Sequence, residues 1–186
     1  MGTDNNDIST VPSLIGGKVI LRPAVPDDIN EAHHWLTQSD PDSVFPYVTR
    51  LISPAEAAEV FKQKPKDEMD ITLSVANKKD EQPAGIVTST NYNSLNRAIE
   101  VNVLIDPERR RKGLGKDALM TFSKYLFMQR GVNKVYAQVG DFNQAGIKLF
   151  ESIGFKKDGT LRNHHFYEGE FHDSLLYSLL RFELDW

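Results

Sequence analysis

A basic segment with two glycines stands between an apolar stretch and a helical pattern. Residues 101–105 read Val-Asn-Val-Leu-Ile, a turn with a proline follows at 106–108, and residues 110–115 read Arg-Arg-Lys-Gly-Leu-Gly. Glycines let backbone amides approach a ligand closely, and the positive end of a helix dipole favours an anion. Arginines add charge-assisted hydrogen bonds, so the segment predicts a phosphate site at the start of a helix. The alternative is an ordinary turn with solvated arginines.

One carboxylate breaks the alternating pattern of a strand that should be largely buried. Glu100 lies within Ala98–Ile105, a segment rich in β-forming residues. A carboxylate in a buried strand can remove a proton from a substrate, so Glu100 is a candidate general base. The alternative is a strand residue that faces solvent. Four histidines could also move protons near neutral pH, although a surface or hydrogen-bonded core position would explain each: His33, His34, His164 and His165.

Composition limits the class of protein. The 186 residues are 40% hydrophobic, which predicts a folded domain and excludes wholesale disorder. No apolar run approaches the roughly 18 residues that a membrane-spanning helix needs, and the first residues lack the pattern of a secretory signal. The absence of cysteine excludes disulfides, thiolate metal sites and a cysteine nucleophile. We therefore expect a soluble cytoplasmic protein that holds no metal and does not associate with a membrane.

The charges are unevenly distributed. Residues 1–70 carry 6 Lys/Arg against 12 Asp/Glu, whereas residues 71–186 carry 16 against 14. A net charge of −4 argues against broad nucleic-acid binding. The basic run at 109–112 instead predicts a local anion site in the second half. The acidic first half is compatible with a cationic partner or with scattered solvated charge.

The elements that must position these residues alternate between strand and helix patterns. Residues 1–17 read as a polar arm and residues 18–186 as a single domain. Polar turns separate the central strands, and Glu168-Gly169-Glu170 reads as a hairpin turn, which predicts a mixed, mostly antiparallel α/β sheet with an inserted β-α-β-α-β unit. Strands are expected at 18–22, 71–77, 84–91, 98–105, 134–139, 155–166 and 174–182, and helices at 26–37, 53–63, 114–130 and 143–153.

Two phosphate-binding motifs compete for the basic segment. Gly113-x-Gly115-x-x-Ala118 formally matches the dinucleotide fingerprint and would indicate a nucleotide-cofactor oxidoreductase. That motif should directly follow the first strands of a doubly wound sheet, whereas several strands and a seven-residue gap precede Gly113 here. The Walker pattern of the P-loop does not occur in the sequence.

A family resemblance accounts for the segment better. Arg110-x-x-Gly113-x-Gly115 resembles the pyrophosphate signature of the GNAT acetyltransferases, and residues 143–155 resemble that family's Asn-x-x-Ala/Ser-x-x-Leu-Tyr/Phe-x-x-x-Gly-Phe helix. The ending at 166–173 is similar to the tail of the ribosomal-protein-alanine and spermidine acetyltransferases. The resemblance covers residues 18–182 and implies the GNAT fold, an α/β fold with about seven strands in a mostly antiparallel sheet and about four helices.

The resemblance implies acetyl-CoA as cosubstrate. Its pyrophosphate would lie on the basic loop, and its pantetheine arm would pair with the backbone of Val103 and Ile105 and hydrogen-bond Asn143. The residues expected to contact it are Val103, Leu104, Ile105, Arg110, Arg111, Lys112, Gly113, Leu114, Gly115, Lys116, Asn143 and Phe150.

The resemblance also implies N-acetylation of a primary amine, a protein N-terminus or a small amine such as a polyamine, by direct attack in a ternary complex. Glu100 would be the base, and a backbone amide near Val103 would hold the oxyanion. Phe150 stands where many members have a tyrosine acid, so water or a histidine on the last hairpin, His165 above all, would protonate the thiolate. The binding site for the acceptor amine would be shaped by His33, His34, Trp35, Phe45 and Tyr47. The protein would be a monomer or a homodimer. A non-catalytic acyl-CoA-binding module is the other alternative.

Overall fold

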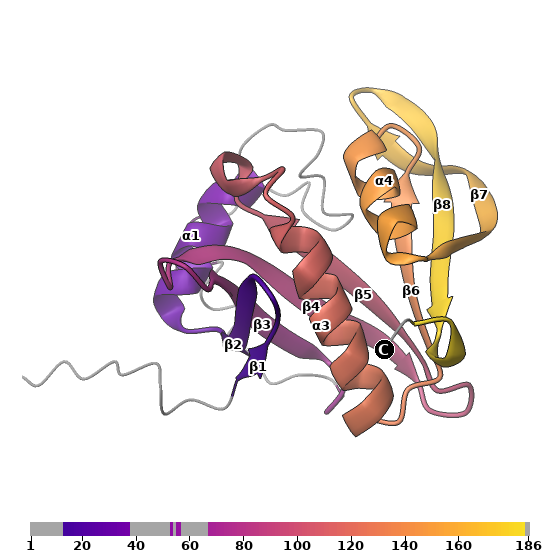
Figure 1. The fold of residues 1–186 in the computed structure, drawn as a ribbon. Coiled ribbons are helices and arrows are strands. Elements are labelled where there is room, and N and C mark those ends of the chain that lie inside the picture. Colours follow the sequence, from indigo (N-terminus) through magenta and orange to yellow (C-terminus); the bar gives the residue numbers. More distant parts are fainter. Residues whose placement is uncertain (1–12, 38–52, 54, 57–66, 185–186) are drawn as a thin grey trace, which may run out of the picture.

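The computed structural model describes residues 13–37, 53, 55–56 and 67–184. These residues form an eight-stranded sheet with three α-helices and two short 3-10 helices (Figure 1). In chain order the elements are β1 (Leu14–Ile15), β2 (Val19–Pro23), α1 (Pro26–Thr37), β3 (Ile71–Asn77), β4 (Pro83–Asn93), β5 (Ala98–Ile105), η3 (Pro107–Arg109), α3 (Leu114–Gln129), β6 (Lys134–Gly140), α4 (Gln144–Ile153), β7 (Lys156–Tyr167), β8 (Glu170–Leu180) and η4 (Arg181–Glu183).

The predicted fold class is confirmed, with small differences in the counts. The strand order is β1-β2-β3-β4-β5-β6-β8-β7, and β5 with β6 is the parallel pair in a sheet whose other described pairs are antiparallel. The eighth strand is the two-residue β1, which falls inside the segment expected to be a polar arm. Most of the helix expected at 53–63 lies outside the described residues, although Ser53 and Glu56 form the reciprocal hydrogen bonds of a capping box.

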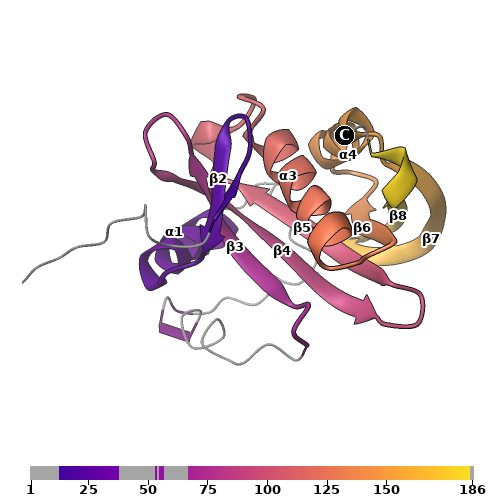
Figure 2. The same cartoon turned by 60° about the horizontal axis from the view of Figure 1, so that its bottom comes forward.

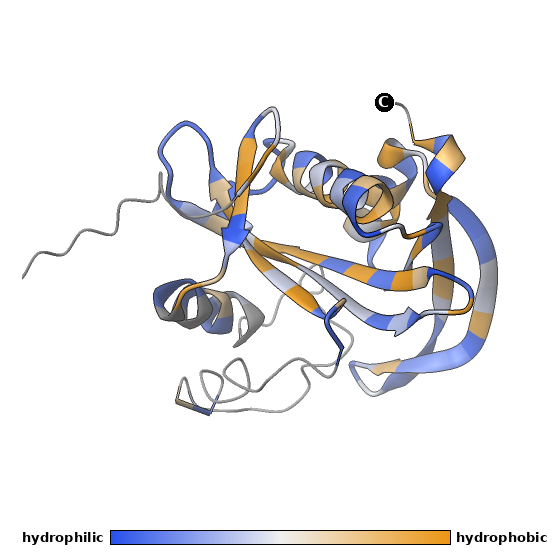
Figure 3. Ribbon diagram, turned by 90° about the horizontal axis from the view of Figure 1, so that it is seen from below, coloured by the Kyte–Doolittle hydropathy of each residue, from blue (hydrophilic) through white to orange (hydrophobic). Residues whose placement is uncertain are grey.

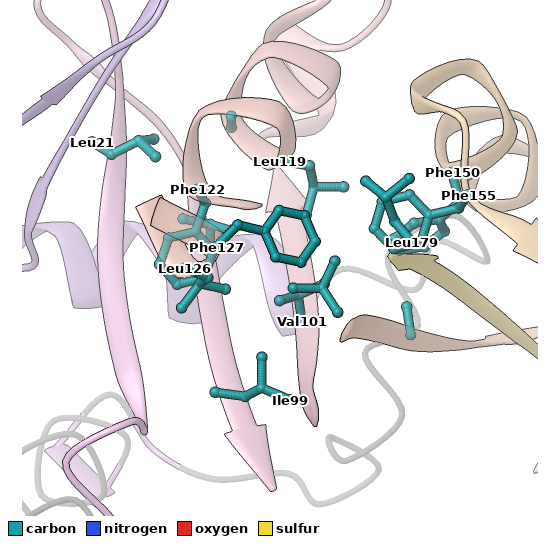
Figure 4. Packing of buried hydrophobic residues seen from close by; sticks show 14 of the residues in the cluster. Leu21, Ile99, Val101, Leu119, Phe122, Leu126, Phe127, Phe150, Phe155 and Leu179 are labelled. Atoms are coloured by element: carbon teal, nitrogen blue, oxygen red, sulfur yellow. The ribbon is translucent and has the colours of Figure 1, made fainter. Parts of the chain in front are cut away.

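The sheet separates two helical layers. α3 and α4 cover one face and α1 covers the other (Figures 2 and 3). On the α3 face, Leu119, Phe122 and Leu126 are fully buried against strand residues that include Ile99 and Val101 (Figure 4). Because side chains alternate along a strand, Glu100, between these two, points to the α1 face.

β5 and β6 pair along only part of their length. The parallel register joins Ala98–Glu100 to Lys134–Tyr136, although β5 continues to Ile105. Over the rest of its length β6 pairs with β8. In the described part of the chain, the β6-facing backbone edge of β5 beyond Glu100 therefore has no strand partner.

A buried ion pair attaches α1 to the sheet. Arg22 on β2 donates from Nη1 to Asp28 Oδ2 at 2.6 Å and from Nη2 to Oδ1 at 2.9 Å. Asp28 also accepts the Val25 amide at 2.9 Å. Both charged side chains are almost completely buried, so their separation would leave an uncompensated charge away from water.

We expect Asp28→Asn to destabilise the protein by about 3 kcal/mol, because the variant leaves the Arg22 guanidinium buried without its counter-charge. Denaturant unfolding followed by circular dichroism measures the loss. Asp27→Asn is the matched control, since Asp27 is the preceding residue of the same helix and is exposed. A loss no larger than that of the control would show that the pair does not hold α1 in place.

Candidate active site

A cavity of about 690 Å³ lies between β5, the basic loop and the starts of α3 and α4. Its walls include Val103 and Ile105 of β5, Gly113 of the loop, Gly115 in the first turn of α3, and Asn143 before α4. All the residues predicted to contact a cofactor line this cavity, except Lys112 and Phe150. Two segments that lie apart in the sequence, residues 103–116 and 143–149, thus line one cavity at the open edge of β5.

The basic loop lines the cavity with Arg110, Arg111 and Gly113. Arg110 donates from Nε to the carbonyl of Ile105 at 3.1 Å, which fixes the loop to the end of β5. Gly113 is the N-cap of α3 and has φ +80°, a left-handed conformation that favours glycine. Because glycine has no side chain, no side-chain cap covers the first amides of the helix. Arg111 and Lys112 are exposed beside it, so this end of the cavity suits an anion.

Asn143 closes the opposite side of the cavity. Its Oδ1 accepts the Gly146 amide at 2.7 Å and so caps α4, as the sequence predicts for the start of this helix. Ala145, Gly146 and Leu149 of α4 also line the cavity. The first turn of α4 therefore offers small residues and a capping amide to an extended ligand.

Glu100 lies where β5 and β6 begin to separate. Its side chain is 0% exposed, so it does not face solvent, and its Oε2 accepts the Asn91 Nδ2 group at 2.7 Å. Tyr136 is its neighbour in the parallel register. Burial raises the pKa of Tyr136 above its ordinary value, and the Glu100 carboxylate raises it further. A buried carboxylate at this position can attract a cation and accept a proton.

Phe150 belongs to the core, and its expected contact with the cofactor is not supported by its position. Its side chain is 5% exposed, and its ring lies 5.1 Å from the ring of Phe155 and 6.4 Å from that of Tyr177. Leu149, the preceding residue, lines the cavity instead. Consecutive helix residues point about 100° apart, so only one of the two can face the cavity.

His165 lies in an aromatic cluster of the β7–β8 hairpin and does not line the cavity. It stands opposite His172 in the strand register, and its ring is 5.4 Å from that of Phe142. Burial lowers the pKa of His165 below its ordinary value, and the neighbouring His164 and His172 lower it further. The ring is therefore neutral at pH 7, which makes it a poor proton donor.

Sequence reasoning missed two members of this cluster. His172 Nδ1 is 3.2 Å from Asp141 Oδ1, and Phe142 contacts both histidine rings. The two-residue hairpin turn at Glu168–Gly169 is the signal that could have placed His172 opposite His165, since the turn sets the register.

The residues expected to shape the acceptor site differ in their burial. Trp35 is buried on α1 against Ile86 and Leu104, where it packs rather than lines an opening. His33 is half-buried and His34 is exposed. Phe45 and Tyr47 lie outside the described residues.

The described residues contain no group of three or more histidine, aspartate or glutamate side chains that could hold a metal ion. None of their helices is both long enough and apolar enough to cross a membrane.

Comparison with known proteins supports the geometry. The chain is 25% identical to the SPbeta prophage-derived uncharacterized N-acetyltransferase YokL of Bacillus subtilis over 174 residues. This alignment covers 91% of this chain and 94% of the relative. The chain is 28% identical to the spermidine N(1)-acetyltransferase of Escherichia coli K12 over 96 residues, 52% of each chain. The solved spermidine N-acetyltransferase of Vibrio cholerae, in complex with CoA and spermine, shares the fold with a TM-score of 0.81, 22% identity and coverage of 89% of this chain and 97% of that one.

The GNAT family is also matched directly. Residues 18–156 match the family described as acetyltransferase (GNAT) domain. This range contains β5, the basic loop, α3 and α4, whose residues line the cavity, and it includes Glu100 on β5. The chain therefore belongs to the GNAT acetyltransferase family and is an N-acetyltransferase.

Proposed function

We propose that this protein transfers the acetyl group of acetyl-CoA to a primary amine by direct attack within a ternary complex. One observation carries the proposal: within the described residues, the β5 edge without a strand partner begins beside the buried Glu100 and ends at the basic loop, and its last residues, Val103–Ile105, line the cavity. A strand with an open edge can bind an extended ligand through main-chain hydrogen bonds. The absence of cysteine from the sequence favours direct transfer over an acetylated enzyme.

Each part of acetyl-CoA has matching groups in the cavity. The amides at the start of α3 and the guanidinium groups of Arg110 and Arg111 suit the pyrophosphate. The backbone groups of Val103 and Ile105 suit the amide groups of pantetheine, and Asn143 faces them from the start of α4. We assign these residues, with Gly113 and Gly115, to the binding of the cosubstrate.

Glu100 supplies the base in this mechanism. An amine is mostly ammonium at neutral pH, so a proton must leave before nitrogen can attack the thioester carbon. The Glu100 carboxylate accepts that proton directly or through water. Attack then gives a tetrahedral intermediate with a positively charged nitrogen and an oxyanion that a backbone amide near Val103 holds. The nitrogen loses its second proton to water, and collapse forms the amide and releases CoA as a thiolate.

The thiolate takes its proton from water. A thiol has an ordinary pKa near 8.5, so its thiolate leaves readily without a strong acid. Phe150 has no proton to donate, and the lowered pKa of His165 leaves its ring neutral at pH 7. The reaction therefore has no need of a dedicated protein acid.

For the acceptor we propose a small polyamine, with a protein N-terminus as the second candidate. The spermidine N-acetyltransferases among the relatives and the buried negative charge of Glu100 support a cationic amine. A screen of thiol release from acetyl-CoA with spermidine, an amino sugar and an alanine-terminated peptide tests this choice. CoA binding without turnover on any amine would favour a non-catalytic acyl-CoA-binding module.

Gly113→Asp should weaken CoA binding by at least tenfold, about 1.4 kcal/mol, because it adds a negative charge beside the phosphates. Calorimetric titration with CoA measures this change. Gly131→Asp is the matched control, since Gly131 also has a positive φ (+68°) but has no other atom within 4 Å of an added Cβ. Equal affinity in both variants would remove the loop from the binding site.

Glu100→Gln should keep its CoA affinity, while kcat/KM falls on the order of 10²–10⁴-fold, because glutamine cannot accept the proton. Glu170→Gln, on the exposed hairpin, is the control for loss of one carboxylate. Full turnover in folded Glu100→Gln would contradict the assigned role.

His165→Ala should lower kcat by less than about tenfold, because general acid catalysis by one side chain contributes typically 10²–10⁴-fold and we assign none to this ring. Steady-state rates at saturating acetyl-CoA measure the effect, with Phe166→Ala on the exposed face of the same strand as control. If His165→Ala abolishes kcat and leaves CoA binding intact, the hairpin carries the acid after all.

A further inference from the structure

Lys18, just before β2, contacts the basic loop although it does not line the cavity. Its Nζ donates a hydrogen bond to the carbonyl oxygen of Lys112 at 3.0 Å. A Cβ added to Gly113 would lie 2.7 Å from the same Nζ. The lysine ammonium therefore lies against the peptide that joins Lys112 to Gly113, next to the first turn of α3.

The backbone of Lys18 is fixed to the same helix. Asp117, in the first turn of α3, accepts the amides of Gly17, Lys18 and Val19 at 3.2, 2.7 and 3.0 Å. The turn before β2 lies directly on the helix, because a Cβ added to Gly16 would come within 2.5 Å of Asp117 Oδ2. Lys18 thus joins α3 through its amide and the loop through its side chain.

This arrangement determines the direction of one amide in the loop. The carbonyl of Lys112 and the N–H of Gly113 belong to a single trans peptide unit, in which the two groups point in opposite directions. Lys18 holds the carbonyl from outside the cavity, so the Gly113 N–H points the other way, toward the cavity that Gly113 lines. A peptide next to a glycine can otherwise adopt several orientations.

We propose that Lys18 is a positioning residue for the phosphates of the cosubstrate, acting through the Lys112–Gly113 peptide. The inference rests on the proposed function, because it assumes that CoA phosphates occupy the loop. It assigns to a residue 94 positions before Lys112 an effect on cosubstrate affinity.

Lys18→Met removes the donor and keeps much of the side-chain length. We expect the Kd for CoA to rise by about tenfold, because affinity falls with the fraction of molecules whose amide is correctly oriented. Lys18→Arg, which can still reach the carbonyl, should restore most of the affinity. Lys78→Met is the matched control: Lys78 donates to the carbonyl of Gly16 in the same turn and does not contact the loop.

The kinetic test separates positioning from general stability. In Lys18→Met, KM for acetyl-CoA should rise while kcat at saturation stays nearly constant. With acetyl-pantetheine, which lacks the phosphates on the loop, kcat/KM should be unchanged. An equal loss with both donors, or no rescue by arginine, would overturn the assignment in favour of a structural role.

The calorimetric outcomes distinguish the two proposals. If the wild-type protein does not bind CoA, the proposed function fails. If the wild type binds CoA and Lys18→Met binds it as tightly as Lys78→Met does, the function stands and the role of Lys18 is wrong.

Discussion

The separation of β5 from β6 beyond Glu100 is the constraint on which the rest of the site depends. Backbone N–H and C=O groups need partners, and an internal strand normally finds them on both sides. The edge of β5 past Glu100 has no strand partner in the described part of the chain. Water or an extended ligand must therefore satisfy these groups, and α3 and α4 flank the opening on one face of the sheet (Figure 1).

The two ends of this edge differ in their electrostatics. At the Ile105 end the chain continues into arginines, a lysine and the amide-rich start of α3, which favour negative charge. At the other end the Glu100 carboxylate is buried and hydrogen-bonded by Asn91, which favours positive charge. A ligand with phosphates at one end and a thioester that meets an ammonium at the other fits this polarity. Under the proposed function, this charge pattern would orient the cosubstrate and the acceptor along the same strand.

Contacts between distant segments hold the surroundings of the cavity in place. Asp117 connects the turn before β2 to the first turn of α3, and the Arg22–Asp28 pair connects β2 to α1. β2 is therefore attached to α3 through the backbone at the beginning of the strand, and to α1 through the side chain of Arg22. Because the two helices lie on opposite faces of the sheet, this strand links the face that α3 covers to the face that Glu100 points to (Figure 3).

Local interactions explain why so much could be predicted from the sequence. Strand alternation, the Asn143 cap and the left-handed Gly113 depend on neighbours within a few residues, and all of them leave a pattern in the chain. For this reason the sequence predicts the helix that starts at residue 114, the hairpin turn at 168–170 and the loop between β5 and α3. The motifs at 110–115 and 143–155 further pointed to the family that the comparisons show.

Packing between distant segments decided the rest. Helical periodicity indicates that Phe150 points toward the interior, but it does not show whether the side chain lines the cavity or packs in the hydrophobic core. In the structure it packs in the core. β1 is two residues long, too short for a recognisable pattern, and exists through its pairing with β2. The contact of Lys18 with Lys112 spans 94 positions, and no periodic signal connects residues so far apart. The sequence by itself determined the elements and the chemistry of the loop, whereas only the tertiary structure decided which side chains meet, because those contacts depend on how the sheet brings separate segments together.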